Sequence, residues 1–88
     1  MRIKNNHDKF ESVKEFIDFL NRGGEVEFRF NNKIYSITHG NNSLYFIEQY
    51  NMLSQQTFSS IGELLEYKIE NYKIYDIITV IKPFFRTF

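Results

Sequence analysis

An alternating segment before Asn31-Asn32, followed by a second strand-like segment, constrains the fold of this chain more than any other feature. Residues 25–30 alternate strictly between polar and apolar side chains, which is the period of a strand with one buried face, and residues 33–38 are expected to form the return strand. Asparagine tolerates the positive φ angles that a type I′ turn requires. The pattern therefore predicts a β-hairpin with a two-residue turn.

The register of this hairpin also follows from the pattern. A two-residue turn places Phe28 opposite Tyr35. It places Val26 opposite Ile37 as well, so that apolar side chains lie beside each other on one face. A shift by one residue would set Val26 and Phe28 against hydroxyl side chains instead. The apolar pairing therefore favours the short turn.

Two amphipathic helices are predicted, one before the hairpin and one well after it. Each begins with a serine followed three residues later by a glutamate, which is the spacing of a capping box: Ser12 with Glu15, and Ser60 with Glu63. The inward faces are then formed by Val13, Phe16, Ile17 and Leu20 in the first helix and by Ile61, Leu64 and Leu65 in the second. The first helix is expected to end at residues 21–24, where two glycines stand together.

Between the hairpin and the second helix, residues 39–43 are expected to form a turn and residues 44–50 a third strand. Residues 51–57 are polar and are expected to form a crossing loop. These elements predict an α+β fold: a small antiparallel sheet of three to four strands around the central hairpin, with both helices packed on one face. That face carries Val26, Phe28, Tyr35 and Ile37.

The segment after the second helix allows two interpretations at each step. Residues 69–75 fit a turn with a short strand or an irregular bridge. Residues 76–81 fit a short helix capped by Asp76 or a strand, and their β-branched side chains favour the strand. Pro83 is expected to end this element or to place it at a sheet edge.

The length of 88 residues indicates one domain, in which residues 1–9 are expected to be a flexible leader. The polar N-terminus lacks the apolar core of a signal peptide. The chain contains no cysteine, which excludes disulfides, a thiolate zinc site and a cysteine nucleophile. We therefore expect a cytoplasmic location.

Basic and acidic residues balance, with 11 of each, so the formal net charge is zero. A protein that binds the phosphate backbone of nucleic acids is usually basic, so this balance argues against that function. A neutral chain also repels its own copies little, which allows a homodimer. No apolar run is long enough for a membrane span, so no membrane association is expected.

The residues that most often carry chemistry form no recognisable site. His7 lies in the polar leader and His39 beside Gly40, and neither has carboxylates at metal-ligand spacing. Glu25 and Glu27 alternate on the outward face of the first strand, which is typical of a solvated sheet face. The sequence thus predicts no catalytic residue, no metal site and no cofactor, and a protein that is not an enzyme.

Three phenylalanines in the last five residues could close the core or form a patch that docks a partner. Under the second interpretation the partner-binding residues are Phe84, Phe85, Arg86 and Phe88. The leading functional hypothesis is accordingly a non-enzymatic protein-interaction module.

A second hypothesis is nucleic-acid binding, because surface aromatics beside basic residues can stack on single-stranded bases. The candidates are Tyr35, Tyr45, Tyr50, Tyr72 and Tyr75, with Lys33, Lys68 and Lys73 near them in sequence.

Residues 12–37 and 61–81 resemble small uncharacterised proteins of low-GC Gram-positive bacteria, their phages and their mobile elements. The abundance of Asn, Ile, Lys, Phe and Tyr is similar to that background. The resemblance carries no catalytic motif. It implies a class that acts by binding, which includes the anti-CRISPR proteins that inhibit a host defence nuclease.

Overall fold

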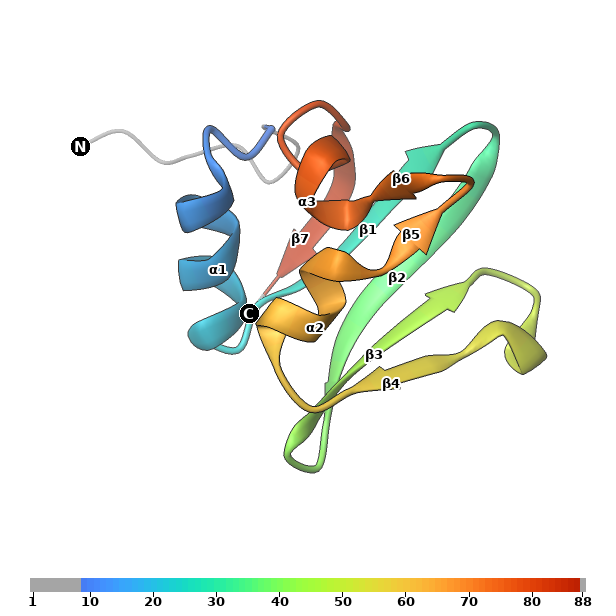
Figure 1. Ribbon diagram of the computed structural model, residues 1–88, viewed down its shortest axis with the longest axis horizontal. Coiled ribbons are helices and arrows are strands. Elements are labelled where there is room, and N and C mark those ends of the chain that lie inside the picture. The colour runs from blue at the N-terminus through green and yellow to red at the C-terminus, as the bar shows by residue number, and fades with distance from the viewer. Residues whose placement is uncertain (1–8, 88) are drawn as a thin grey trace.

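The predicted hairpin forms the centre of a five-stranded antiparallel sheet in a computed structural model that describes residues 9–87 (Figure 1). Of Phe84 and Phe85 only the backbone is described. The strands lie in the order β4-β3-β2-β1-β7. Their bounds are β1 (Glu25–Phe30), β2 (Lys33–Gly40), β3 (Ser43–Glu48), β4 (Gln56–Phe58) and β7 (Pro83–Thr87).

The predicted register of the central hairpin is confirmed. Phe28 pairs with Tyr35 and Val26 pairs with Ile37. Asn31 and Asn32 have φ angles of 50° and 67°, as the two-residue turn requires. The register and its turn are therefore consistent with each other and with the apolar pattern.

The turn predicted at residues 39–43 is present but shorter, because β2 runs on to Gly40 and β3 begins at Ser43. The turn consists of two residues, the second of which, Asn42, has a φ angle of 59°. A Cβ atom at Gly40 would collide with the ring of Tyr45. The absence of a side chain at Gly40 thus lets the strands approach each other up to the turn.

Helices cover one face of the sheet, together with a second small hairpin. They are α1 (Val13–Asn21), α2 (Ile61–Glu66) and α3 (Ile74–Ile77), and the hairpin consists of β5 (Lys68–Ile69) and β6 (Tyr72–Lys73). Figure 1 shows α2, α3 and this hairpin in front of β1 and β2. Both predicted caps are present: the Ser12 hydroxyl accepts the Glu15 N–H at 3.0 Å, and the Ser60 hydroxyl accepts the Glu63 N–H at 3.2 Å.

The covered face is the predicted one. Val26, Phe28, Tyr35 and Ile37 are all buried in a single core cluster. The rest of that cluster comes from the strand β3, the helices and the segment around them: Phe10, Phe16, Phe19, Leu20, Leu44, Phe46, Leu64, Leu65, Ile69, Ile74, Ile77, Ile78 and Ile81. The α+β class is therefore confirmed, with the core between the sheet and its helical layer.

Two elements make the sheet larger than the predicted three to four strands. The segment expected to be a crossing loop contains β4, preceded by the short 3-10 helix η1 (Met52–Ser54). The second addition is β7, which begins at Pro83 and pairs with β1 at the opposite edge. β4 has only three residues, too few to show a period of two, and β7 pairs with a strand more than fifty residues earlier in the chain, so local patterns contain little information about either strand.

The strand favoured for residues 76–81 is also wrong. The chain forms α3 and continues in turns, with the Ile78 and Ile81 amides bonded to the carbonyls of Ile74 and Ile77. All four of these isoleucines are buried. Their spacing of i, i+3, i+4 and i+7 is that of a helix face, and burial of that face outweighs the strand preference of β-branched residues.

Residues 69–75 left two interpretations open. Residues 69–73 belong to the tight hairpin of β5 and β6, and α3 begins at Ile74. Glu70 and Asn71 have φ angles of 51° and 76°, again a two-residue turn. Among residues 9–87 no helix is long and apolar enough to cross a membrane.

Candidate functional site

The β3–β4 loop, residues 49–55, presents three large apolar side chains to solvent. Tyr50 is 95% exposed, Met52 78% and Leu53 97%. Single exposed apolar residues are common on protein surfaces, but three in four consecutive positions form a local apolar surface. Such a surface is typical of a site that contacts another molecule.

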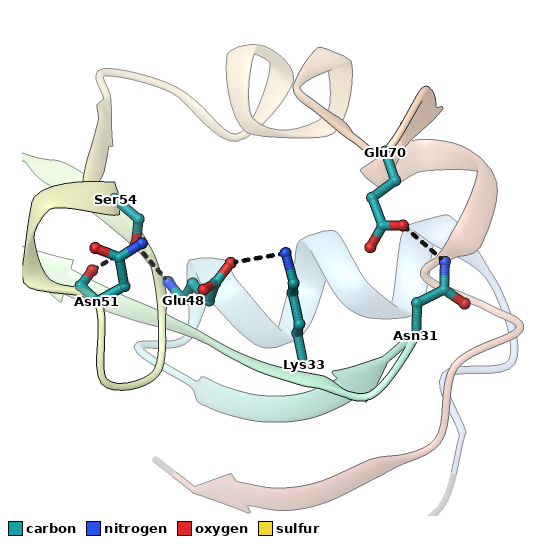
Figure 2. Close-up of polar contacts among 6 residues, drawn as sticks. All are labelled: Asn31, Lys33, Glu48, Asn51, Ser54 and Glu70. Carbon is teal, nitrogen blue, oxygen red and sulfur yellow. Dashed lines mark hydrogen bonds and ion pairs between the residues drawn. The ribbon is translucent and has the colours of Figure 1, made fainter.

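Hydrogen bonds hold this loop in place (Figure 2). The Ser54 hydroxyl accepts the Glu48 N–H at 2.9 Å and donates to the Asn51 carbonyl at 2.6 Å. The Asn51 N–H in turn bonds the Glu48 carbonyl at 3.1 Å, and the Gln49 N–H bonds the Ile34 carbonyl at 2.7 Å. The exposed side chains therefore stand on a backbone that is already ordered.

An ion pair extends this network along the end of the sheet. The Nζ of Lys33 lies 3.6 Å from Oε1 of Glu48. Asn31 donates from its side-chain amide to Glu70 at 3.2 Å, which links the central hairpin to the turn between β5 and β6 (Figure 2). Burial raises the pKa of the Tyr35 hydroxyl, and the carboxylates of Glu48 and Glu70 raise it further.

The loop leads into an edge of the sheet that carries no charge. β4 pairs with β3 on one side only, so alternate backbone groups of β4 point away from the sheet. From Gln49 to Gly62 no residue is charged, in a chain where 25% of residues are. Figure 1 shows β4 and the preceding loop at the free edge, away from α1.

We define the exposed site as the β3–β4 loop together with β4. The sequence analysis missed it, because residues 51–57 were assigned to a crossing loop without a role. The available signal was the long uncharged segment, in which Tyr50, Met52 and Leu53 occur without the periodicity of a buried element.

The residues proposed for partner binding at the C-terminus lie at the other edge. The backbone of Phe84, Phe85 and Arg86 belongs to β7, where a bulge opposite Glu27 and Phe28 makes Phe84 the extra residue. Arg86 is only 9% exposed. The side chains of Phe84 and Phe85, and all of Phe88, lie outside the described residues, so their role in binding stays a prediction.

A groove of about 670 Å³ lies on a third part of the surface. It runs between the end of α1, the turn between β2 and β3, and the start of α2, and His39 is its titratable residue. The His39 Nε2 lies 3.1 Å from the Gly24 carbonyl, which can only accept, so this nitrogen carries the proton. The Ser60 hydroxyl caps α2 and the Ser59 hydroxyl bonds Glu63. These polar groups are thus already used within the fold.

The other residues considered for chemistry are distributed over the surface. Glu25 accepts the His39 backbone N–H at 3.1 Å, and Glu27 is half-buried on the sheet face opposite the core. His7 lies outside the described residues. Among residues 9–87 no three His, Asp or Glu side chains lie close enough together to hold a metal ion.

The tyrosines considered for base stacking are divided by the fold. Tyr35 is buried, and Tyr45 is half-buried on the outer face, whereas Tyr50, Tyr72 and Tyr75 are exposed. Two of the three candidate lysines have acidic partners: Lys33 pairs with Glu48, and Lys73 lies 2.9 Å from Glu66. The hydrogen bond between Lys73 and Glu66 raises the pKa of Lys73. Lys68 is exposed beside β6.

Comparison with protein-family models, with curated proteins and with solved structures found no significant match.

Proposed function

We propose that this chain is a non-enzymatic protein-interaction module that binds a partner through its exposed site. The observation that carries the proposal is the exposure of Tyr50, Met52 and Leu53 on a hydrogen-bonded loop. An apolar side chain that stands in water contributes little to folding. It contributes to binding when a partner covers it.

The ordered backbone supports this proposal in a second way. Binding costs free energy when a loop and its side chains must be immobilised, about 0.5–1.5 kcal/mol for each flexible side chain. Ser54 and Asn51 already hold the loop, so the backbone part of that cost is met by folding. Tyrosine and methionine, the residues at positions 50 and 52, are enriched in protein interfaces, tyrosine for its aromatic ring and methionine for its flexible thioether.

The test is affinity capture from a lysate of a low-GC Gram-positive bacterium, with the wild type and two variants. Leu53→Glu places a charge in the exposed site. Val80→Glu is the matched control, because Val80 is also an exposed apolar residue, at 66%, but lies outside the site. A specific protein retained by wild type and Val80→Glu but lost with Leu53→Glu is the expected result. Equal retention by Leu53→Glu would assign binding to another surface.

A narrower form of the proposal follows from the resemblance to small phage and mobile-element proteins. In this form the partner is a bacterial defence nuclease, and the chain acts as an anti-CRISPR-like inhibitor in the cytoplasm. The assay is DNA cleavage by purified defence nucleases of such hosts with the protein added in excess. Inhibition that Leu53→Glu abolishes and Val80→Glu keeps is expected, and cleavage unaffected by the wild type would reject the narrower form.

One observation favours a second candidate function, the binding of single-stranded nucleic acid. Tyr72 and Tyr75 are 54% and 51% exposed, and Lys68 lies on the strand that pairs with β6. Fluorescence anisotropy with labelled oligonucleotides at low and high salt tests this candidate. Salt-sensitive binding that is weakened by Tyr72→Ala is expected, and the absence of binding at low salt would reject it.

A further inference from the structure

We propose that β4 pairs with β4 of a second copy of this chain, antiparallel and about a two-fold axis near Thr57. This inference deepens the proposed function, because it names a partner for the same exposed site. It rests on three observations about the edges of the sheet, and each is independent of the resemblance described above.

The first observation is the difference between the two edges. β7 begins with Pro83, which has no N–H to donate, and follows the exposed Lys82. Proline and lysine are two of the residues by which sheet edges avoid pairing with other chains. β4 contains neither proline nor lysine, and it contains no charged residue. The edge at β7 thus carries two protective residues, whereas β4 carries neither and is limited as an edge by its length of three residues.

The second observation is the uncharged segment from Gln49 to Gly62. Around a two-fold axis every residue close to the axis lies near its own copy, so a charge there would meet the same charge. The loop, β4 and the start of α2 carry no charge, so this repulsion does not arise. Because the net charge of the whole chain is zero, two copies also repel each other little at longer range.

The third observation is the geometry along the edge. Antiparallel pairing centred on Thr57 places Gln56 opposite Phe58 of the second copy. Backbone in the extended conformation reaches beyond β4, at Gln55 and at Ser60. Because the exposed apolar loop leads directly into β4, a second copy that pairs with β4 lies beside that loop.

The strength of this dimer is limited by its size. β4 has three residues, so the strand pairing buries less surface than a standard stable interface does. We therefore expect a reversible dimer with a dissociation constant on the order of micromolar to hundreds of micromolar.

Sedimentation velocity over a concentration series of the full chain tests the inference. The wild type should shift from monomer to dimer as the concentration rises. Thr57→Lys places two like charges at the axis and should weaken dimerisation at least about tenfold. Thr87→Lys, which adds the same charge at the exposed end of β7, should leave it unchanged. Equal melting curves of both variants would show that each is folded.

A cross-linking experiment tests the position of the axis. The chain has no cysteine, so a single introduced cysteine can form a disulfide only between copies. Thr57→Cys should form covalent dimers under mild oxidation much faster than Arg29→Cys, whose side chain is exposed on a central strand. Equal rates would place the contact elsewhere.

The inference and the proposed function fail in different ways. A wild type that stays monomeric at millimolar concentration, or a dimer that Thr57→Lys does not weaken, overturns self-pairing. Loss of a captured protein with Leu53→Glu is measured on immobilised chains and does not require self-pairing. The dimerisation measurement and the affinity capture can therefore fail independently of each other.

Discussion

The guanidinium carbon of Arg86 lies 4.1 Å from the centre of the Phe10 ring and 4.9 Å from that of Phe19. The contact joins β7 to α1 through Phe19 and to the segment before α1 through Phe10. Phe10 and Phe19 themselves lie 5.4 Å apart, so the three side chains form one packed group. Arg86 therefore contributes to the closure of the domain.

We expect Arg86→Ala to lower the free energy of unfolding by about 2 kcal/mol, because a desolvated cation–π contact and its packing are lost. Arg86→Lys should recover only part of this, since an ammonium group does not stack on a ring as a planar guanidinium does. Urea denaturation measures both. Arg29→Ala, at an exposed position, is the control and should change stability by less than about 0.5 kcal/mol. A similar effect of Arg86→Ala and Arg29→Ala would contradict this role.

Phe28→Ala should cost about 3–5 kcal/mol, because Phe28 is fully buried at the centre of the core. Its ring lies 5.7 Å from Tyr35 and 6.4 Å from Phe46. Phe30→Ala is the matched control on the same strand and face, where the ring is half-buried beside Tyr72, and it should cost less. Thermal unfolding followed by circular dichroism gives the comparison. A cooperative melt of Phe28→Ala near the wild-type midpoint would place Phe28 outside the core.

The two glycines at strand ends should differ in their response to alanine. A Cβ at Gly24 would lie 2.5 Å from two ring carbons of Phe19, which is buried and cannot move away. Gly24→Ala should therefore cost about 1–3 kcal/mol. A Cβ at Gly40 meets the outer end of Tyr45, whose half-buried ring can rotate, so Gly40→Ala should cost less. Chemical denaturation of the two variants decides the order, and the reverse order would refute the argument.

The free energy of unfolding should fall at alkaline pH, because the buried hydroxyl of Tyr35 must then ionise. Burial raises the pKa of its hydroxyl above the ordinary value of 10.0, so the folded state favours the neutral form. The contribution of Tyr35 to the free energy of unfolding is fully present below the pKa that its hydroxyl has in the unfolded chain. It is lost as the pH rises through the pKa of the same hydroxyl in the folded protein. The free energy of unfolding of Tyr35→Phe should drop less between pH 8 and pH 11 than that of the wild type. Tyr50→Phe, at an exposed position, should behave like the wild type. Equal losses in all three proteins would exclude Tyr35 as the cause.

Ser54→Ala should loosen the β3–β4 loop without affecting the core. The variant loses a bond from the Glu48 amide and a bond to the Asn51 carbonyl, worth about 1 kcal/mol each. Hydrogen exchange of the Glu48 amide should accelerate, and binding through the exposed site should weaken although its apolar side chains are unchanged. Ser43→Ala, which removes only a 3.4 Å bond in the turn at the other end of β3, is the control. Unchanged exchange at Glu48 would show that other contacts hold the loop.

The sequence by itself determined the features that depend on neighbouring residues. The register of Phe28 with Tyr35 follows from a two-residue turn and a period of two, and the caps at Ser12 and Ser60 depend on residues three positions apart. These patterns act over short separations, so they can be recognised without knowledge of the fold. The buried face of the hairpin was predicted for the same reason.

Only the tertiary structure decided the features that depend on strand pairing and burial rather than on a local pattern. Residues 56–58, too short to show a period of two, become the strand β4 because β3 offers them hydrogen bonds, and β7 is held by β1, more than fifty residues earlier in the chain. The isoleucines from Ile74 to Ile81 form helical turns because the core accepts that face. Arg86, which looked like a surface residue, is enclosed by two aromatic rings. Burial and strand pairing between distant segments outweigh local preference at these positions, and they leave the uncharged edge at β4 exposed.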